Sequence, residues 1–519
     1  MKTATKVTVT RRPERFVSDD RRVITRFFRV DGEQRVRSIV QRVLALEAQE
    51  VDQLLEQVRR DFGPRHRQLD DIFQQHFEQV RPHVPNAKRL SAKRRLLIGA
   101  YFTMEYSIES AALFNPSIVL HPDQVGLEDD EARFLMSLRA TGEGHISSIV
   151  FRTGVVDGEG HIRFDPASRF TARMSVQEDR LYEKTLFARK LSEMAALNDT
   201  ARRILDELPE QFTAQQLDHT IAETEPTAGG RAATTNAEPS NAAAIAAFSE
   251  TTDNMRWLAR SNYHLELPLD TDPSEIVIFP ASENESNGIE DVRLTRFVDD
   301  DGSVTYFGTY TAYNGFRILP QLLETQNFSH IAIHTLNGDC AQNKGMALFP
   351  RKINGLYHMI SRLDGENMYL MRSDNVHFWN DAQLLQYPRY AWELVQIGNC
   401  GPPIETEAGW ILLTHGVGPM RQYCIGVVLL DRDDPSKVIG DLDEPLLVPE
   451  EGERDGYVPN VVYSCGALLH QSHLIIPYAV SDRITTFASL DVNELIDALL
   501  ARGGHAPEIT SATRQSAAG

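Results

Sequence analysis

The stretch Gly302-Ser303-Val304-Thr305-Tyr306-Phe307-Gly308-Thr309-Tyr310 carries the pattern that decides the fold. A turn glycine opens it, and a run rich in β-branched and aromatic residues follows, as in a short strand. The same combination recurs at Gly355, Gly409 and Gly466, so that the four glycines are spaced by 53, 54 and 57 residues. A repeat of about 50 residues is typical of the four-stranded blades of a β-propeller.

An earlier turn extends this repeat toward the N-terminus. It contains Gly158 and lies between the strand-like residues around Phe151 and Phe164. With this turn included, the sequence predicts a mainly β fold built as a five-bladed β-propeller. A β-sandwich with irregular loops is the alternative that periodicity alone leaves open.

An N-terminal helical region is predicted from apolar spacing. Residues 40–62 and 72–80 place apolar side chains three and four positions apart, which puts them on one stripe of a helix. We therefore expect a helical region over residues 1–105, followed by the propeller over residues 106–490. A short helix and a polar tail are expected over residues 491–519.

A helical insertion is predicted to interrupt the blades over about residues 165–260. Its first part, about residues 175–208, repeats apolar residues on one helical side. Its second part, about residues 223–246, is rich in Ala, Thr, Gly, Pro and Asn, which predicts a flexible connection.

The composition limits the classes of function. The chain has 519 residues, of which 42% are apolar, and a formal net charge of −20. This charge argues against a nucleic-acid or anionic-membrane surface. No signal-like or membrane-spanning apolar run is found, and the four cysteines are widely separated. We expect reduced thiols in a cytoplasmic protein with no nucleic-acid or membrane partner.

Polar clusters at similar places in the predicted blades are the candidate functional residues, because the inner ends of propeller blades surround a central funnel. A sugar site there needs carboxylates for proton transfer and for hydroxyl contacts. The clusters are Glu290–Arg293, Arg362–Asn367 with Ser373–Trp379, Gly401–Thr406 with Thr414–Tyr423, and Pro477–Asp482.

Each cluster also has a purely structural interpretation. From spacing alone, Glu290 and Asp291 beside Arg293 are more often an ion pair than a functional site, and a lone His415 is more often structural than catalytic. Asp374 and His377 near an aromatic residue are more suggestive of a pyranose site. Motifs of phosphate-binding loops, dinucleotide-binding folds, serine hydrolases and zinc proteases are missing, as is metal-ligand spacing.

Taken in order, the clusters resemble glycoside hydrolase family 130, the family of β-mannoside phosphorylases and related β-mannosidases. The resemblance is strong over about residues 262–490. It is carried by Glu285–Arg293, Met346–Gly355, Gly401–Trp410, His415–Val417 and Leu429–Pro435, with weaker matches at Phe114–Val119 and Gly142–Ile149. The long form with N-terminal helices looks like the members that act on β-1,2-linked mannosides.

The resemblance implies an inverting phosphorolysis of a β-mannoside that releases α-mannose 1-phosphate. The family's catalytic aspartate falls on Asp291, which is expected to protonate the glycosidic oxygen through a sugar hydroxyl. Phosphate is already anionic, so it needs basic donors in place of a carboxylate base. The expected phosphate-binding residues are Arg362, Lys344, Arg421, His415 and Tyr423. The expected sugar-binding residues are Asn115, Arg139, Asp374, Asp482 and Glu405. Phosphate is expected as co-substrate, with no cofactor and no metal.

One departure from the family pattern keeps a second reaction open. Many phosphorylases of the family carry a lysine where this chain has Glu405, and hydrolytic relatives use carboxylates to activate water. A β-mannoside hydrolase is therefore the alternative, in which Glu405 competes with Arg421 to define the nucleophile. A non-catalytic sugar-binding propeller is the third hypothesis. The apolar stripe of the N-terminal helices also predicts a homo-oligomer.

Overall fold

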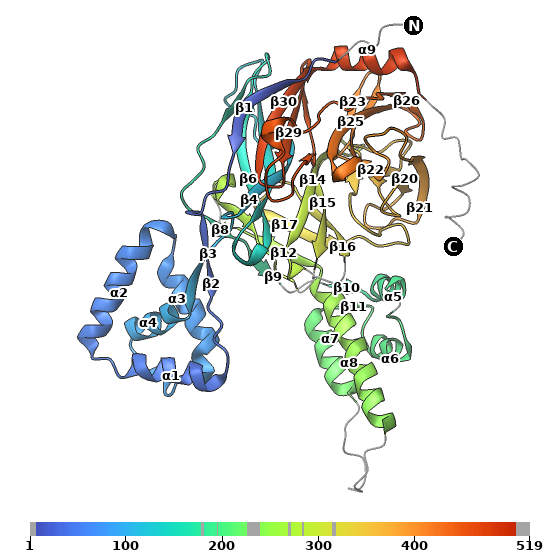
Figure 1. Ribbon diagram of the computed structural model, residues 1–519. Coiled ribbons are helices and arrows are strands. Elements are labelled where there is room, and N and C mark those ends of the chain that lie inside the picture. Colours follow the sequence, from blue (N-terminus) through green and yellow to red (C-terminus); the bar gives the residue numbers. More distant parts are fainter. Residues whose placement is uncertain are drawn as a thin grey trace.

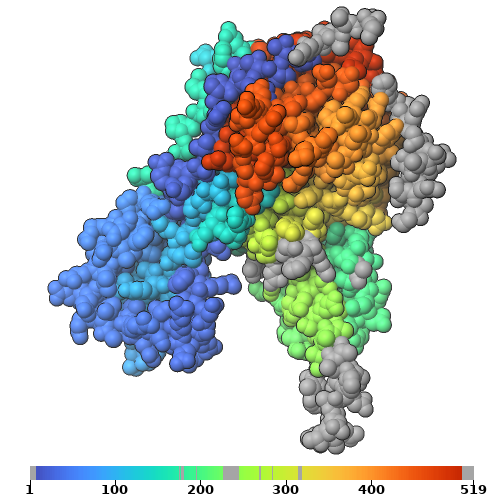
Figure 2. Space-filling model, viewed as in Figure 1, coloured from blue at the N-terminus to red at the C-terminus, as the bar shows by residue number. Residues whose placement is uncertain are grey.

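A computed structural model describes residues 7–177, 181–194, 196–225, 239–267, 271–282, 285–313 and 318–504. The fold is mainly β, with a large β body from which two helical units project on the same side (Figures 1 and 2). Within the described residues, the β body contains five sheets of four strands or more. Each sheet is named below by the strand that opens its hydrogen-bonded order.

The first two sheets carry most of the N-terminal part of the β body. In the β4 sheet, β4 (Ala112–Leu120), β5 (Ala132–Thr141), β6 (Ser147–Val156), β13 (Ile276–Ile278) and β8 (Ala172–Arg173) follow in order, and β7 (Ile162–Phe164) pairs with β6. The β14 sheet has the order β14 (Ile289–Val298), β15 (Val304–Tyr313), β16 (Ile318–Thr325), β17 (His330–Thr335), β12 (Tyr263–Glu266) and β9 (Ser175–Gln177).

The next two sheets follow along the chain. The β18 sheet has the order β18 (Ala347–Leu348), β19 (Tyr357–Ser361), β20 (Met368–Ser373) and β21 (Asp381–Gln386). In the β22 sheet, β22 (Gln396–Asn399), β24 (Gly409–Val417), β25 (Tyr423–Leu430) and β26 (Val438–Asp441) follow in order, and β23 (Ile404–Thr406) pairs with β24.

The fifth sheet, called the β27 sheet, joins the two ends of the chain. It contains β27 (Val462–Tyr463), β29 (His473–Val480), β30 (Ile484–Asp491) and β1 (Thr10–Phe16), with β28 (Leu468–His470) paired to β29. The antiparallel pairing of β1 with β30 brings Thr10 opposite Ser489. The segment 1–105 is therefore not helical throughout, because β1 lies in the β body. Its four arginine and glutamate residues hide the alternation of a strand from a hydrophobicity pattern.

Contacts between the sheets run from each one to the next along the chain. The β4 sheet contacts the β14 sheet, which contacts the β18 sheet, and the β18 sheet contacts the β22 sheet through β19, β20 and β22. The β22 sheet contacts the β27 sheet through β25 and β27, and β29 of that last sheet contacts β4 of the first. The sheets thus form a closed cycle of neighbours, although no single sheet closes on itself.

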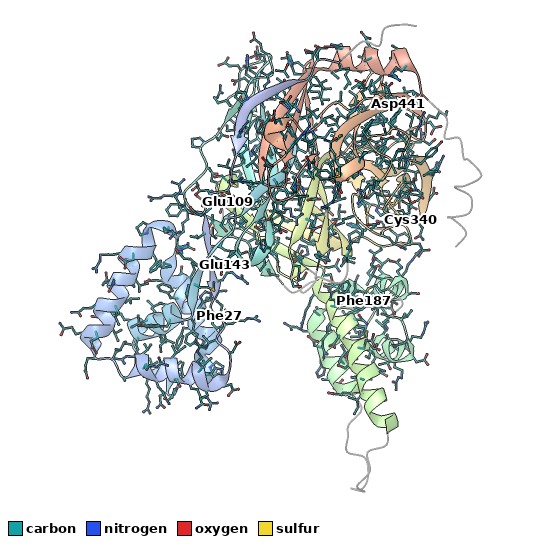
Figure 3. All side chains as sticks on the ribbon, viewed as in Figure 1. Phe27, Glu109, Glu143, Phe187, Cys340 and Asp441 are labelled. Atoms are coloured by element: carbon teal, nitrogen blue, oxygen red, sulfur yellow. The ribbon has the colours of Figure 1, made fainter. Side chains whose placement is uncertain are left out.

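The N-terminal helical unit packs around its own core. It consists of α1 (Glu33–Leu44), α2 (Ala48–Phe62), α3 (Leu69–Val80) and α4 (Ala92–Tyr101), and a two-stranded ribbon of β2 (Val23–Phe27) and β3 (Thr103–Ser107) connects it to the β body. The predicted stripe is buried at Val40, Val43, Val51 and Leu55. Phe27 contributes from the ribbon, as Figure 3 shows.

The second helical unit occupies the predicted insertion. It contains α5 (Lys184–Glu193), α6 (Asp199–Glu207), α7 (Ala214–Thr224) and α8 (Pro239–Arg260), with the short pair β10 (Tyr182–Glu183) and β11 (Gln211–Phe212). Phe187, labelled in Figure 3, belongs to its core. The stretch expected to be helical from about 175 begins with strand β9, which pairs with β12. Of the flexible connection predicted over about residues 223–246, residues 226–238 lie outside the described part of the chain. Residues 239–246 form the start of α8, so the prediction was wrong there, because the run of alanines favours a helix.

Two further features complete the fold. The helix α9 (Val492–Arg502) lies where the C-terminal helix was predicted, and its N-cap residue Asp491 accepts hydrogen bonds from the backbone of Asn493 and Glu494. The four cysteines, all within the described part of the chain, are buried and unpaired. None of the helices described is both long enough and apolar enough to span a bilayer.

Candidate active site

A cavity of about 320 Å³ is lined by residues from strands of four sheets and, beside the β18 sheet, by Arg362 directly after β19. Its lining contains five basic side chains and three carboxylates. These are Arg139, Glu290, Asp291, Arg293, Lys344, Arg362, Arg421 and Asp482. A local excess of positive charge inside a chain of net charge −20 indicates that the cavity is built to receive an anion.

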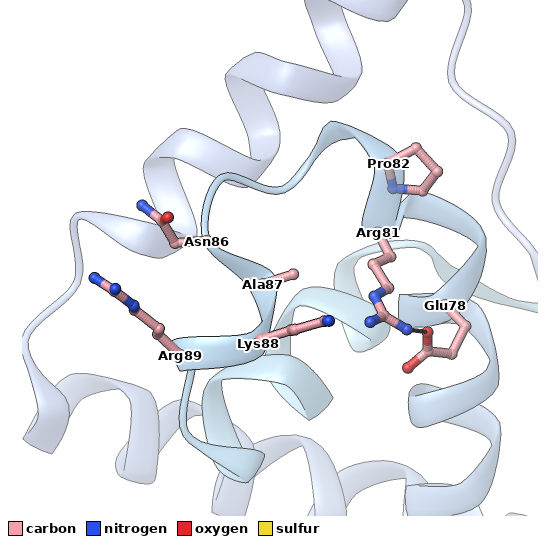
Figure 4. A pocket seen from close by; sticks show the side chains of 7 residues that line it. All are labelled: Glu78, Arg81, Pro82, Asn86, Ala87, Lys88 and Arg89. Carbon is pink, nitrogen blue, oxygen red and sulfur yellow. Dashed lines mark hydrogen bonds and ion pairs between the residues drawn. The ribbon is translucent and has the colours of Figure 1, made fainter.

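A second and larger hollow lies in the N-terminal helical unit, away from these residues. It has a volume of about 670 Å³ and is lined by residues of α3 and of the turns that follow, including Arg81, Lys88 and Arg89 (Figure 4). Its one carboxylate, Glu78, already accepts a hydrogen bond from Arg81 at 2.8 Å. This hollow offers no second carboxylate for acid or base chemistry, so the cavity in the β body is the candidate active site.

Backbone bulges place the two central side chains of the cavity. The pairing of β14 with β15 shifts register between Glu290 and Arg293, and Asp291 in this bulge has a φ of +54°. The pairing of β4 with β5 shifts in the same way around Asn115, which has a φ of +48°. A bulge turns a side chain away from the regular alternation of a strand. Both residues can therefore point into the cavity from strands whose neighbouring residues are buried.

Left-handed backbone conformations are concentrated at this cavity. Arg421 and Asp482 also line it and have φ values of +55° and +51°. Such conformations cost about 1–3 kcal/mol each for residues other than glycine, and they cluster at functional sites. Gly288, with a φ of +117°, precedes the bulge of β14, and a Cβ there would lie 2.3 Å from Oγ of Ser147. The backbone that leads to Asp291 therefore passes too close to Ser147 for any residue other than glycine at position 288.

Asp291 is held by donors on two sides. Nδ2 of Asn115 donates to Oδ1 of Asp291 at 2.6 Å, and Nη1 of Arg139 donates to the same oxygen at 3.4 Å. Arg139 also donates to Glu290 at 3.1 Å, and Nζ of Lys344 donates to Glu290 at 3.3 Å. The ion pair that the sequence pattern left open involves Arg139 rather than Arg293. Arg293 instead donates to the backbone oxygen of Asp291 at 3.0 Å.

The two aspartates of the cavity have pKa values shifted in opposite directions. Burial acts to raise the pKa of Asp291, but the charges of Arg139 and Arg293 and the bond from Asn115 outweigh it and hold the pKa below its usual value. Burial, and then repulsion by Asp291, raise the pKa of Asp482 to about 6. The cavity therefore pairs a firmly ionised carboxylate with one that is protonated in mildly acidic solution.

His415 is a neutral residue that orients Arg362. Its Nδ1 lies 3.0 Å from the backbone oxygen of Asn399 and donates to it, which leaves Nε2 to accept from Nη1 of Arg362 at 3.3 Å. Burial, followed by the charges of Arg362 and Arg293, lowers the pKa of His415 to about 3. His415 therefore contributes no positive charge, and its one acceptor is committed to the guanidinium of Arg362.

Two guanidinium groups of the cavity have no carboxylate partner among the described residues. Arg362 bonds to the neutral His415, and its Nε is buried without a hydrogen-bond partner. Arg421 forms no ion pair with a described carboxylate; its Cζ lies 6.0 Å from the centroid of the Tyr423 ring, and its charge acts on Asp482 at longer range. Arg362 is half-buried and Arg421 is exposed. A bound phosphate or other oxyanion would accept paired hydrogen bonds from such guanidinium groups, including the buried Nε of Arg362.

The structure brings together most of the residues that the sequence singles out. Nine of them line the cavity, and they come from strands of the β body or from the turns that connect them. They are Asn115, Arg139, Asp291, Lys344, Arg362, His415, Arg421, Tyr423 and Asp482. Their shared position in the cavity is a finding, and the role of each residue stays a prediction.

Asp374 and Glu405 are the two predicted site residues that lie outside the lining of this cavity. Asp374 is exposed in the turn that follows β20. Glu405 lies in β23, where Arg351 donates to it at 2.6 Å and Arg432 approaches it to 3.0 Å. These hydrogen bonds, that from Arg351 first, lower the pKa of Glu405. Glu405 is thus an ion-pair residue on the outer part of the β22 sheet, and it does not compete with Arg421.

Several residues that position the site were not predicted from the sequence. The clearest are Arg293, Asn399 and Tyr463, which form one chain in which Nε of Arg293 donates to Asn399 at 3.1 Å and Nη2 donates to the Tyr463 hydroxyl. All three line the cavity. Arg293 stands in the same quoted cluster as Asp291, but nothing in the sequence indicated that Asn399 and Tyr463 would meet it.

Comparisons with known proteins agree with this geometry. Residues 270–501 match the family model of glycoside hydrolase family 130, described as β-1,4-mannooligosaccharide phosphorylase. The chain is 35% identical over 221 residues to a 1,2-β-oligomannan phosphorylase of Thermoanaerobacter sp. (strain X514), a match that covers 41% of this chain and 72% of that protein. It is 28% identical over 249 residues to a β-1,2-mannobiose phosphorylase of Listeria innocua, covering 47% of this chain and 68% of that protein.

A solved structure was also found. The β-1,2-mannobiose phosphorylase of Listeria innocua, in complex with β-1,2-mannobiose, aligns over 76% of this chain and 94% of its own, with 19% identity and a TM-score of 0.44. The sequence match to the Thermoanaerobacter enzyme carries the assignment, because it combines 35% identity with most of that enzyme's length. The chain therefore belongs to glycoside hydrolase family 130 and is an enzyme of the glycoside phosphorylase class.

Proposed function

We propose that this enzyme catalyses the inverting phosphorolysis of β-1,2-linked mannosides, giving α-mannose 1-phosphate and a shortened acceptor. The observation that carries this proposal is the division of the cavity. Asp291 and its donors Asn115 and Arg139 belong to one group of contacts, while Arg362 and Arg421 have no carboxylate partner among the described residues. An inverting phosphorolysis needs these two parts, an acid and an anion site.

The arrangement of the five sheets supports a proposal about the fold. We infer that the five sheets of the β body are the five blades of a propeller, with the cavity in the central funnel. Support comes from the closed cycle of contacts between neighbouring sheets and from the cavity lining, which includes strands of four sheets and Arg362 directly after β19 of the β18 sheet. The helical units then stand outside the ring, at residues 1–105 apart from β1 and at about 165–260.

In this mechanism Asp291 is the residue that supplies the proton to the leaving glycosidic oxygen, relayed through a sugar hydroxyl. Asn115, Arg139 and Asp482 hold the mannose unit whose bond is cleaved. Arg362, Lys344 and Arg421 hold the phosphate that attacks from the opposite face, and Tyr423 lies beside Arg421. His415 acts by fixing the guanidinium of Arg362. No carboxylate base is required, because phosphate is already anionic.

The ionised state of Asp291 links the two halves of the site. Its pKa is low in the free cavity because Arg139, Arg293 and Lys344 stabilise the carboxylate. A phosphate bound among the cations adds negative charge and raises the pKa of a nearby carboxylate. Phosphate binding would thus favour the protonated form of Asp291 that the reaction needs. The bound nucleophile would in this way help to protonate the general acid.

The choice of β-1,2-mannosides rests on the relatives. Two of them are named for β-1,2-linked substrates, whereas the family model is described for β-1,4-mannooligosaccharides. Hydrolysis is the weaker alternative, because Glu405, the residue that suggested it, lies outside the cavity in an ion pair with Arg351. A cytoplasmic location and a homo-oligomeric state stay predictions; the four buried thiols support a reducing compartment.

The decisive experiment follows both the substrate and the phosphate. The enzyme is incubated with β-1,2-mannobiose or β-1,4-mannobiose, with and without inorganic phosphate, and the products are identified by ³¹P and ¹H NMR. We expect α-mannose 1-phosphate from the β-1,2-linked sugar, only when phosphate is present. Free mannose formed equally in both conditions would show hydrolysis and overturn the proposal. Faster turnover of the β-1,4-linked sugar would overturn the linkage but not phosphorolysis.

A further inference from the structure

A cluster of two histidines and one glutamate lies outside the active site, where the β14 sheet meets the β18 sheet. It consists of Glu324 in β16, His334 in β17 and His377 in the loop after β20. One nitrogen of each imidazole and one carboxylate oxygen all lie within 4.8 Å of one another. We propose that these three residues bind a divalent transition-metal ion of the Zn²⁺ type and that the ion fastens the two sheets together.

The register of the β14 sheet places two of the ligands on one face. Leu322 of β16 stands directly opposite His334 of β17, so Glu324, two residues further along, is the diagonal neighbour of His334 on the same side. Leu322 on that side packs in a core with residues of the β18 sheet and with Trp379. Glu324 and His334 therefore face the neighbouring sheet, from which the third ligand comes.

The loop that carries His377 is fixed before any ion binds. The backbone nitrogen of Asn337 donates to the oxygen of His377 at 2.9 Å, and the nitrogen of Trp379 donates to the oxygen of Asn337 at 2.8 Å. The backbone nitrogen of His377 donates to Oδ1 of Asn375 at 2.9 Å, and the Trp379 side chain is fully buried. A site whose ligands are already in place loses little entropy when it binds an ion.

Two of the three distances between ligand atoms are close to those around a tetrahedral ion. Oε2 of Glu324 lies 3.7 Å from Nε2 of His334 and 3.5 Å from Nε2 of His377. Bonds of about 2.0–2.2 Å to a tetrahedral zinc ion separate its ligand atoms by about 3.3–3.6 Å. Nε2 of His377 is buried and makes no hydrogen bond to the described residues, although it lies close to the carboxylate. A metal bond would satisfy this nitrogen.

The chemistry of the three donors selects the kind of ion. Two imidazoles and one carboxylate are a ligand set that zinc and related transition metals use, with a fourth position left to water. Magnesium and calcium prefer oxygen ligands only. The two rings lie 4.5 Å apart between centroids, close enough for two neutral imidazoles to bind one ion.

The position of the cluster indicates a stabilising role. Helix α5 of the second helical unit packs at the same place. There Cζ of Arg189 lies 3.7 Å from the centroid of the Phe378 ring, and Nζ of Lys190 donates to the backbone oxygen of Leu336 at 2.8 Å. None of the three ligands lines the active-site cavity. An ion here would join two sheets and the base of the helical unit, and its effect should be seen in stability and metal content without any measurement of activity.

The test is metal binding by the full chain after treatment with a chelator. Equilibrium dialysis against Zn²⁺, followed by elemental analysis, should give one ion per chain and a higher Tm, with no such effect of Mg²⁺. Co²⁺ should give the visible absorption of a tetrahedral nitrogen and oxygen site. His377→Ala and Glu324→Gln should each weaken Zn²⁺ binding by more than about tenfold. Both side chains are about one-third exposed, at 34% and 37%, so these variants should fold.

A matched control comes from the same strand. His330 is exposed in β17 and is not one of the three ligands, so His330→Ala should bind Zn²⁺ as the wild type does. Retained stoichiometric binding in His377→Ala would overturn the assignment and place the ion elsewhere. The assignment would also be overturned if the wild type failed to bind Zn²⁺ at micromolar free concentration and if added Zn²⁺ left its Tm unchanged. The three residues would then be an ion-pair cluster.

Discussion

Asn115 donates from Nδ2 to Oδ1 of Asp291 at 2.6 Å, and both residues hold a left-handed backbone inside a bulge. They come from the inner strands of two neighbouring sheets, β4 and β14, which are in contact. Each bulge would turn a side chain into solvent if the other sheet were absent. The pair therefore makes the proposed acid depend on how two sheets are packed, and not only on the strand that carries it.

Replacing Asp291 by Asn should remove catalysis while leaving the fold intact. Asparagine tolerates the left-handed conformation of this position as well as aspartate does. Loss of the acid should lower kcat by about 10²–10⁴-fold with a smaller change in KM. Steady-state phosphorolysis and thermal unfolding of D291N measure the two quantities. Activity within tenfold of the wild type would remove Asp291 from the proposed role.

Replacing Arg362 by Ala should weaken phosphate binding more than sugar binding. Arg362 has no carboxylate partner among the residues described, so its charge is available to the anion. A charge-assisted contact of this kind contributes about 1.5–3 kcal/mol, so KM for phosphate should rise by roughly 10–150-fold. Arg351→Ala is the control, because Arg351 pairs with Glu405 outside the cavity. A change confined to the KM for the mannoside would contradict the assignment.

Glu405→Gln should leave the reaction almost unchanged. The carboxylate bonds to Arg351 and Arg432 and not to any residue of the cavity lining. Partly exposed ion pairs contribute about 0–1 kcal/mol, so only a small fall in Tm is expected. Activity should stay within about twofold, as measured by mannose 1-phosphate release. Loss of activity in E405Q would revive the hydrolytic interpretation, in which this residue activates water.

Asp482→Asn should stabilise the protein at neutral pH. The pKa of Asp482 is raised to about 6 in the folded protein, so its negative charge destabilises the native state above that pH. Removing the charge should add about 1–2 kcal/mol to the free energy of unfolding at pH 7. The gain should shrink as the pH falls through 6 and vanish below 4, where aspartate is protonated in both states. Denaturant unfolding across this pH range provides the check.

Phosphate binding should draw protons onto the enzyme through Asp291. The anion reduces the stabilisation of the ionised carboxylate by Arg139 and Lys344, so the pKa of Asp291 should rise on binding. Calorimetric titrations in two buffers of different ionisation enthalpy give the number of protons taken up. That number should be larger for the wild type than for D291N. Equal uptake by both proteins would separate the anion site from the acid.

The sequence predicts the large elements where apolar spacing is strong. The buried stripe of Val40, Val43, Val51 and Leu55 lies on the expected helices, and Gly302 turns between β14 and β15 as the repeat implies. Strand β1 is not predicted, because five of its seven residues are Thr, Arg or Glu and they form no hydrophobic alternation. Packing against β30 decides its conformation, and a partner so distant in the sequence cannot be inferred from local pattern.

The site residues were also predicted only in part. Residues in quoted clusters on the inner parts of the sheets, such as Asp291 and Arg421, line the cavity, whereas Glu405 and Asp374 do not. Which end of a strand faces the cavity depends on sheet register, and spacing along the sequence contains no such information. The cluster of Glu324, His334 and His377 could not be predicted from the sequence either. Its members come together only through the pairing of β16 with β17 and through a distant loop.

The pairing of β1 with β30 has a consequence for how the protein is made. β1 is synthesised long before its partner, since Thr10 lies opposite Ser489 and the other four sheets lie between them in the sequence. Until β30 is synthesised, β1 has no strand to pair with in this sheet. Closure over so long a loop is slow to find. Once formed, the pairing joins β1 to the β27 sheet, so that β1 cannot separate without exposing an edge of β30.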